Sequence, residues 1–265
     1  MSLSAGSLAA VIVLIAGASV ATAADIGRSA TPSLTYPINW SGAYAGADIG
    51  GGWSSDNVNY YTGDGFPPYA RIDTAKVDGS GLLGGVFAGY NYQLNNAIVA
   101  GVEGDFEGTS IGGKNHCMIV TTSGTPYCPP SSGAQSTSDA LPWQGSLRGR
   151  LGYAAGNALI YATGGLAFAQ INTGYAGEVA PGTGSDSFSR TRAGWTLGTG
   201  VDYALNSNWV VRAEYRYSSF GSIKDTMINA PLGAVSATAG HAGVDENAVR
   251  IGIAYKFDAP ASTAR

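Results

Sequence analysis

Apolar and polar positions alternate along eight stretches of this chain, each about ten residues long. An alternation with period two is typical of a β-strand whose two faces meet different surroundings. A heavily charged face cannot be buried in an ordinary sandwich core, whereas a barrel that is apolar toward lipid and charged toward its own lumen accommodates both faces. The pattern is clearest in residues 209–219, where Trp209, Val211, Ala213, Tyr215 and Tyr217 oppose Arg212, Glu214 and Arg216.

The connections between these stretches are alternately short and long. The short ones are rich in Asn and Gly, which supply the positive φ of tight hairpin turns: residues 94–96, 155–157 and 206–208. The long ones are residues 54–80, 109–142, 171–192 and 221–245. We therefore predict an all-β fold, an eight-stranded antiparallel transmembrane β-barrel with short periplasmic turns and four long extracellular loops. Its strands are expected at residues 40–53, 81–93, 97–108, 143–154, 158–170, 193–205, 209–220 and 246–257.

The ends of the chain predict export. An apolar run, Leu8–Val20, precedes Ala21-Thr22-Ala23, a small-x-small cleavage pattern, although no Lys or Arg precedes the run. We interpret residues 1–23 as a cleaved signal peptide; the alternative is an N-terminal membrane anchor, for which the run is short. The expected organisation is then a periplasmic segment (24–39), the barrel domain (40–257) and a short C-terminal tail (258–265).

Composition narrows the function classes. A net charge of −4 and 12% charged residues offer no basic footprint, so no nucleic-acid partner is expected. The 40 Gly and 15 Tyr favour strands and turns over helices. Cys117 and Cys128 lie in one Gly/Ser/Pro-rich stretch and are predicted to form a disulfide in an oxidising compartment. A free thiol pair and a metal site with His116 are the alternatives, and we expect no metal or cofactor.

The polar faces of the strands predict a charge network inside the lumen. Charges out of bulk water need partners, and Glu103 and Asp105 are expected beside Arg148 and Arg150 on the adjacent strand. Because an eight-stranded barrel is about wide enough for side chains to fill, the network is interpreted as a plug, with a narrow gated ion path as the alternative. Its acidic members are Asp48, Glu103, Asp105, Glu107, Asp202 and Glu214; its basic members are Arg148, Arg150, Arg212, Arg216, Arg250 and Lys256.

Aromatic residues gather where the expected strands end. Amphipathic rings prefer the membrane–water interface, so we predict aromatic girdles, although strands favour aromatic residues in any case. The predicted girdle residues are Trp143, Trp195, Trp209, Tyr217, Tyr255 and Phe257, within a wider set that includes Trp40.

Several motifs resemble a known family. They are Trp40-Ser-Gly-Ala-Tyr44, the Gly-Tyr-Asn-Tyr-Gln run ending at Gln93, residues 101–106 (GVEGDF) and residues 250–257 (RIGIAYKF). Over residues 40–257 the chain is similar to the alphaproteobacterial "porin family" of small outer-membrane β-barrel proteins, related to the OmpA-like transmembrane β-barrel. This resemblance implies the cell outer membrane of a Gram-negative bacterium, contact with its lipid and lipopolysaccharide, and use of the outer-membrane insertion machinery. Relatives usually end on the last aromatic residue, whereas here residues 258–265 follow Phe257.

Catalysis finds little support in the sequence. Its two histidines, His116 and His241, fall in expected loops outside any recognisable motif, so we predict that the protein is not an enzyme. We expect an integral outer-membrane barrel with a structural, envelope-integrity role, to which a weak, narrow porin activity could be added. Closure leaves no strand edge to pair, so a monomer is expected. The alternative is a surface receptor or adhesin that binds a ligand such as haemin through Tyr60, Tyr61 or Tyr69 with one of the histidines.

Overall fold

The computed structural model describes residues 38–63, 70–95, 97–116, 136–179, 182–221, 223–227 and 236–257. These residues belong to one compact unit, Pro37–Arg265. None of them forms a helix long and apolar enough to cross a membrane. They form nine strands: β1 (Gly42–Gly63), β2 (Ala70–Gln93), β3 (Ile98–His116), β4 (Ser136–Ala155), β5 (Ala158–Val179), β6 (Gly182–Ala204), β7 (Trp209–Ser219), β8 (Ile223–Met227) and β9 (Ser236–Lys256).

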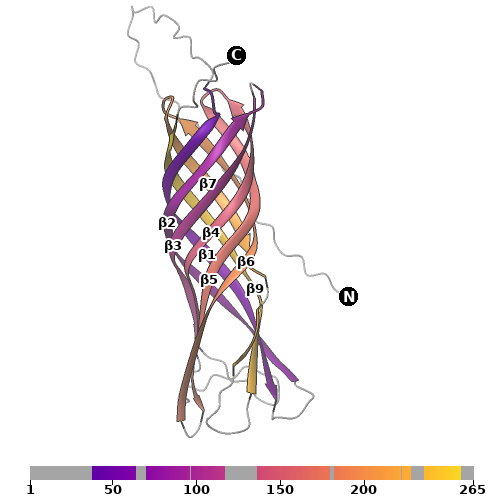
Figure 1. The fold of residues 1–265 in the computed structure, drawn as a ribbon. Coiled ribbons are helices and arrows are strands. Elements are labelled where there is room, and N and C mark those ends of the chain that lie inside the picture. Colours follow the sequence, from indigo (N-terminus) through magenta and orange to yellow (C-terminus); the bar gives the residue numbers. More distant parts are fainter. Residues whose placement is uncertain are drawn as a thin grey trace, which may run out of the picture. The chain divides into compact units, whose positions relative to one another are not determined.

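The strands close into an antiparallel β-barrel (Figure 1). Each strand from β1 to β6 pairs with the next, β7 pairs with β9, and β9 returns to β1. The short β8 also pairs with β9, farther along it than β7 does. Strands β7 and β8 therefore share one position in the wall, interrupted near Gly221, whose φ of 68° suits glycine. The predicted eight-stranded barrel is confirmed.

The tight turns fall where the sequence predicts them. Asn95 Oδ1 accepts hydrogen bonds from the backbone N–H groups of Ala97 and Ile98, both at 2.9 Å or less. Asn206 Oδ1 makes the same kind of contact in the β6–β7 turn. The β4–β5 turn contains Gly156 at φ 62°. We call this side of the barrel the tight-turn end and the opposite side the long-hairpin end.

The strands are longer than the hydrophobic pattern indicates. Strands β5 and β6 pair from Ala158↔Tyr203 to Val179↔Gly182, so most of the predicted loop 171–192 is a regular hairpin. The pairing of β1 with β2 similarly extends to Thr62↔Ala70. These predicted loop boundaries are wrong because apolar alternation marks the part of a strand that faces lipid. Backbone pairing needs no apolar face, and it continues into the polar residues beyond.

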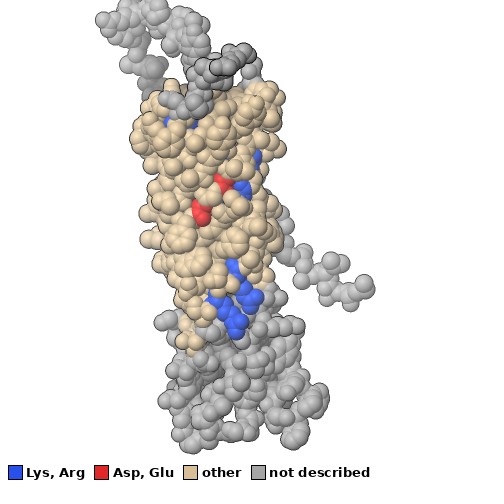
Figure 2. Space-filling view, in the orientation of Figure 1, with Lys and Arg blue, Asp and Glu red and all other residues tan. Residues whose placement is uncertain are grey.

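The outer wall is apolar and the inner wall is not. Large aliphatic side chains face outward with more than half of their surface exposed, for example Leu82 (68%), Ile251 (63%) and Leu147 (61%). On the face shown in Figure 2, residues other than Lys, Arg, Asp and Glu cover most of the described wall. The predicted outward faces are confirmed. The structure also shows which face of the Gly-rich strands β2 and β5 is outward: Leu82 and Val86 point outward from β2, and Ile160 and Leu166 from β5.

Candidate functional site in the barrel interior

A layer of paired charges fills the middle of the barrel. Among the described residues, ion pairs join five arginines to five carboxylates, so their formal charges cancel, and each of these side chains is at most 5% exposed. Strands β3, β4, β6, β7 and β9 supply them from their inward faces. We call this set the interior network: Arg148, Arg150, Arg212, Arg216 and Arg250 with Glu103, Asp105, Glu107, Asp202 and Glu214.

Glu103 is the carboxylate nearest to the tight-turn end of β3, and it contacts three guanidinium groups. Its Oε1 accepts from Arg148 at 2.5 Å, and its Oε2 accepts from Arg212 at 2.7 Å and lies 3.5 Å from Arg150. The Tyr44 hydroxyl donates to the same Oε2 at 2.7 Å. Glu103 is directly opposite Arg148 in the β3–β4 register, as the sequence predicts.

Other carboxylates tie the arginines together across the lumen. Glu214 Oε1 accepts from Arg148 at 2.8 Å and from Arg216 at 3.0 Å, while its Oε2 accepts from the Tyr161 hydroxyl at 2.9 Å. Asp202 accepts from Arg212 at 2.9 Å and pairs with Arg150. Strands on opposite walls are thereby linked by charge-assisted hydrogen bonds.

The network continues toward the long-hairpin end. Arg216 donates to Asp105 at 3.0 Å, and Arg250 donates to Glu107 at 2.8 Å. Gln144 extends the chain of contacts, because its amide donates both to Glu107 at 2.9 Å and to Glu246 at 3.0 Å. Glu246 is 1% exposed and was not predicted as a member. Glu246 is the first residue of the last expected strand, where the alternation alone does not show whether a side chain faces the lumen or the outside.

Two tyrosines missed by the sequence analysis line the network. The Arg150 guanidinium lies 3.6 Å from the Tyr161 ring centroid, a cation–π distance. Tyr44 lies opposite Gly89 and Tyr161 opposite Gly200 in the strand registers. A Cβ at Gly200 would stand 2.5 Å from the Tyr161 hydroxyl oxygen, so the missing side chain makes room for the ring. A glycine paired with an inward tyrosine is the sequence signal that could have found both.

Apolar layers border the charged layer on both sides. At the tight-turn end, Trp40, 2% exposed, packs inside the barrel with Phe87, Leu159 and Val210. Its interior position contradicts its assignment to the outer aromatic set. Trp40 precedes β1 and folds into the lumen, where its backbone N–H donates to Gln93 Oε1 at 2.9 Å. Toward the long-hairpin end the second layer contains Leu141, Ala167, Ala169, Ile171, Phe220 and Val244.

The remaining predicted residues lie outside the network or outside the described residues. Asp48 is half-buried on β1, and its Oδ1 has no hydrogen-bond partner among the described residues. Lys256 lies at the tight-turn end, where its Nζ donates to the backbone carbonyl of Asn39. Cys117, Cys128 and Tyr69 lie outside the described residues. The backbones of Tyr60, Tyr61, His116 and His241 belong to strands β1, β3 and β9, so their assignment to loops is wrong.

The predicted girdle residues form ring contacts at two levels of the wall. Trp209 and Tyr255 lie 5.2 Å apart between centroids at the tight-turn end, and Phe257 lies 5.3 Å from Tyr255. Nearer the long-hairpin end, Trp195 contacts Tyr217 at 5.3 Å, and Trp143 stacks on Phe106 at 5.6 Å. The eight residue-to-residue steps from 209 to 217 span roughly 26 Å of strand, or about 20 Å of height at the usual tilt, close to the thickness of an apolar band.

The interior chemistry is that of closed ion pairs. Within the described ranges, no group of three or more His, Cys, Asp or Glu side chains is placed to hold a metal ion. The carboxylates of the interior network instead accept from guanidinium groups that are themselves buried. Such an arrangement holds the wall together across its diameter.

Comparison with known proteins places these features in a family. Residues 10–257 match the family model described as the outer membrane protein beta-barrel domain. The 31 kDa outer-membrane immunogenic protein of Brucella melitensis is 32% identical over 264 residues, covering 94% of this chain and 98% of that protein. The 22 kDa outer membrane protein of Rhizobium leguminosarum is 34% identical over 179 residues, covering 67% of each.

Solved structures with a similar course of the chain include outer-membrane proteins. The outer membrane protein OprG of Pseudomonas aeruginosa is 15% identical, with a TM-score of 0.46 over 84% of this chain and 99% of that one. The protein is located in the outer membrane, as its relatives are by name. On the strength of the family match and the two bacterial relatives, this chain belongs to the outer membrane protein β-barrel family.

Proposed function

We propose that the protein is a structural, non-enzymatic and monomeric component of the outer membrane, with a lumen closed to diffusing solutes. The observation that carries this proposal is the filled interior, in which the interior network lies between two apolar layers. The apolar wall and the two aromatic levels anchor the barrel in the bilayer.

The packing of the lumen argues against steady conduction. A hydrated path would have to separate arginine–carboxylate pairs that are held at 2.5–3.0 Å, such as Arg148–Glu103 and Arg216–Asp105. Leaving one partner of a buried pair alone costs about 3–5 kcal/mol. The path would also have to pass Trp40 and the apolar residues around it, which offer water few hydrogen-bonding partners. A weak porin activity would therefore require rare rearrangements of the interior.

The orientation follows from the lengths of the connections. Outer-membrane barrels keep short turns in the periplasm and send long connections outside, so the long-hairpin end faces the exterior. Hairpins of this length would present a large part of the chain at the cell surface. The Brucella relatives are named immunogenic, which fits surface presentation in this family. The side chains named for the haemin-receptor alternative lie outside those that the structure describes.

Bilayer conductance tests the closed lumen. The full mature chain is refolded, its folding is checked by heat-modifiable gel mobility, and it is inserted in a planar bilayer beside a known open porin as a positive control. We expect no stable unitary steps from the wild type. Trp40→Gly combined with Glu103→Ala and Arg148→Ala removes an apolar layer and a central ion pair, and should increase conductance. Stable steps from the folded wild type would overturn the proposal.

A further inference from the structure

The outer wall changes polarity abruptly across β5 and β6. Leu166 and Phe168 point outward from β5, and the next outward residues of that strand are Gln170 and Asn172. Trp195 occupies the neighbouring outward position on β6. The change coincides with the aromatic level near the long-hairpin end, so it marks the boundary between hydrocarbon and headgroups.

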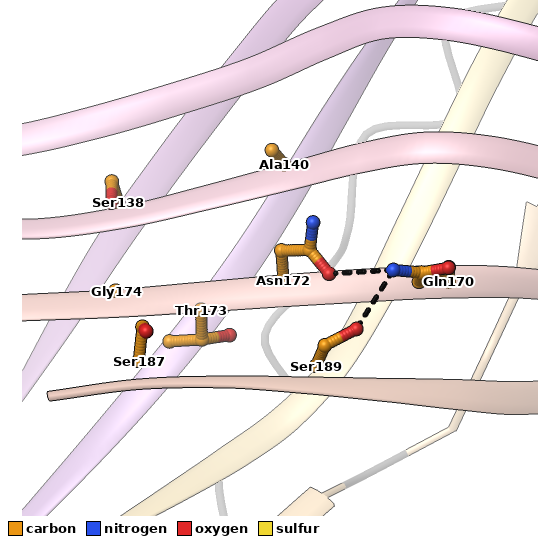
Figure 3. Close-up of a pocket in the computed structure, with 8 residues that line it drawn as sticks. All are labelled: Ser138, Ala140, Gln170, Asn172, Thr173, Gly174, Ser187 and Ser189. Atoms are coloured by element: carbon orange, nitrogen blue, oxygen red, sulfur yellow. Dashed lines mark hydrogen bonds between the residues drawn. The ribbon is translucent and has the colours of Figure 1, made fainter.

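A hydrogen bond fixes the polar side chains at this boundary. The Trp143 indole N–H donates to Gln170 Oε1 at 2.5 Å. The Gln170 amide then donates to Asn172 Oδ1 at 3.1 Å and to Ser189 Oγ at 2.8 Å, as the dashed lines in Figure 3 show. Gln170 is thus held at both ends of its carboxamide, and it positions groups on both β5 and β6.

A recess of about 410 Å³ opens beside these groups. It lies across strands β4, β5 and β6 (Figure 3), and its volume falls within the range of small-molecule sites. Its lining combines uncharged hydroxyl and carboxamide side chains with the apolar surface of Ala140 and Gly174; the polar members are Ser138, Gln170, Asn172, Thr173, Ser187 and Ser189. Such groups both donate and accept hydrogen bonds, which matches the hydroxyl groups of a sugar ring.

We infer that this recess binds a sugar of the lipopolysaccharide headgroup while the acyl chains lie on the apolar wall beside it. The recess lies beside Trp143, which donates to Gln170, and Phe168 faces outward two residues before Gln170 on β5. This position favours a sugar that is attached to hydrocarbon over a free one, because both parts of the ligand then find complementary surface. The inference rests on the proposed orientation, in which the long-hairpin end meets the outer leaflet, where lipopolysaccharide is found.

Binding of lipopolysaccharide to the folded barrel tests the inference. The full mature chain is placed in phosphatidylcholine nanodiscs that contain a minor fraction of rough lipopolysaccharide or, separately, phosphatidylglycerol, and bound lipid is counted by native mass spectrometry. Ser189→Trp fills the recess. Ser80→Trp is the matched control, since Ser80 is also an exposed serine, on strand β2 and outside the recess. Heat-modifiable mobility shows that each variant is folded.

We expect Ser189→Trp to lower the apparent lipopolysaccharide affinity about tenfold and Ser80→Trp to change it less than twofold. Equal loss in both variants, no loss in Ser189→Trp, or equal retention of phosphatidylglycerol would overturn the inference. Deacylated core oligosaccharide should bind much more weakly than the intact glycolipid; equal affinity would show that the site takes a free saccharide, and it would refute the lipid assignment. These outcomes are independent of the conductance result, so the closed-lumen proposal can fail separately.

Discussion

Neutralising Glu103 should destabilise the barrel by an amount that its contacts define. Glu103→Gln keeps the shape of the side chain but removes a charge that Arg148 and Arg212 contact at 2.5 and 2.7 Å. Both arginines keep another carboxylate, because Arg148 pairs with Glu214 at 2.8 Å and Arg212 with Asp202 at 2.9 Å. The cost should therefore lie near the lower limit for breaking a buried pair, about 3 kcal/mol, which is roughly a hundredfold in the unfolding equilibrium constant.

Urea unfolding in phospholipid vesicles, followed by tryptophan fluorescence, measures this cost. Ser207→Ala is the control, because Ser207 is exposed in the β6–β7 turn and its substitution should change the free energy of unfolding by less than about 0.5 kcal/mol. Adding Arg212→Met to Glu103→Gln restores charge balance, so the double variant should be more stable than the sum of the single losses predicts. If Glu103→Gln costs no more than Ser207→Ala, the interior charges are hydrated and the reasoning is wrong.

Further substitutions test the other layers by the same unfolding measurement. Trp40→Ala should cost about 3–5 kcal/mol by leaving a cavity in the apolar layer, and a loss below 1 kcal/mol would contradict its packing role. Gly200→Val should prevent folding or displace the Tyr161 ring, whereas Gly149→Ala, whose Cβ meets nothing closer than 3.8 Å, should be tolerated; equal effects would refute the steric argument. Ile251→Arg on the outer wall, midway between the two aromatic levels, should cost about 2–4 kcal/mol, and a neutral result would place this position outside the hydrocarbon.

The hydrophobic pattern predicts the wall because lipid and lumen impose opposite demands on alternate residues. Strand β7 illustrates this: Arg212, Glu214 and Arg216 are buried, while Trp209 and Val211 face outward, as the alternation requires. The register of ion pairs could also be anticipated locally, since adjacent strands joined by a hairpin must bring opposite charges together. The fold and most of the interior network can therefore be predicted from residues whose polarity is unambiguous.

The features missed are those for which polarity carries little information. Tyr44 and Tyr161 are amphipathic and suit either face, and their strands contain glycines that hide the alternation. Trp40 precedes the first strand, so no period assigns it to a side. The long-hairpin pairing is missed for a related reason: beyond the hydrocarbon both faces of a strand meet water, and the apolar period that marks a strand disappears.

The interior charges do more than fill space, because they specify the register of the wall. A one-residue shift of a strand exchanges its two faces and would carry its arginines into hydrocarbon. An Arg that faces lipid costs about 2–4 kcal/mol at the bilayer midplane and less toward the interfaces, so a slip of β7, which carries Arg212 and Arg216, would cost a few kcal/mol before its lost pairs are counted. An interior of aliphatic residues would resemble the outer wall and would leave such slips almost free. The balanced network thus selects a single arrangement of strands. This selection explains why a closed barrel retains buried ion pairs.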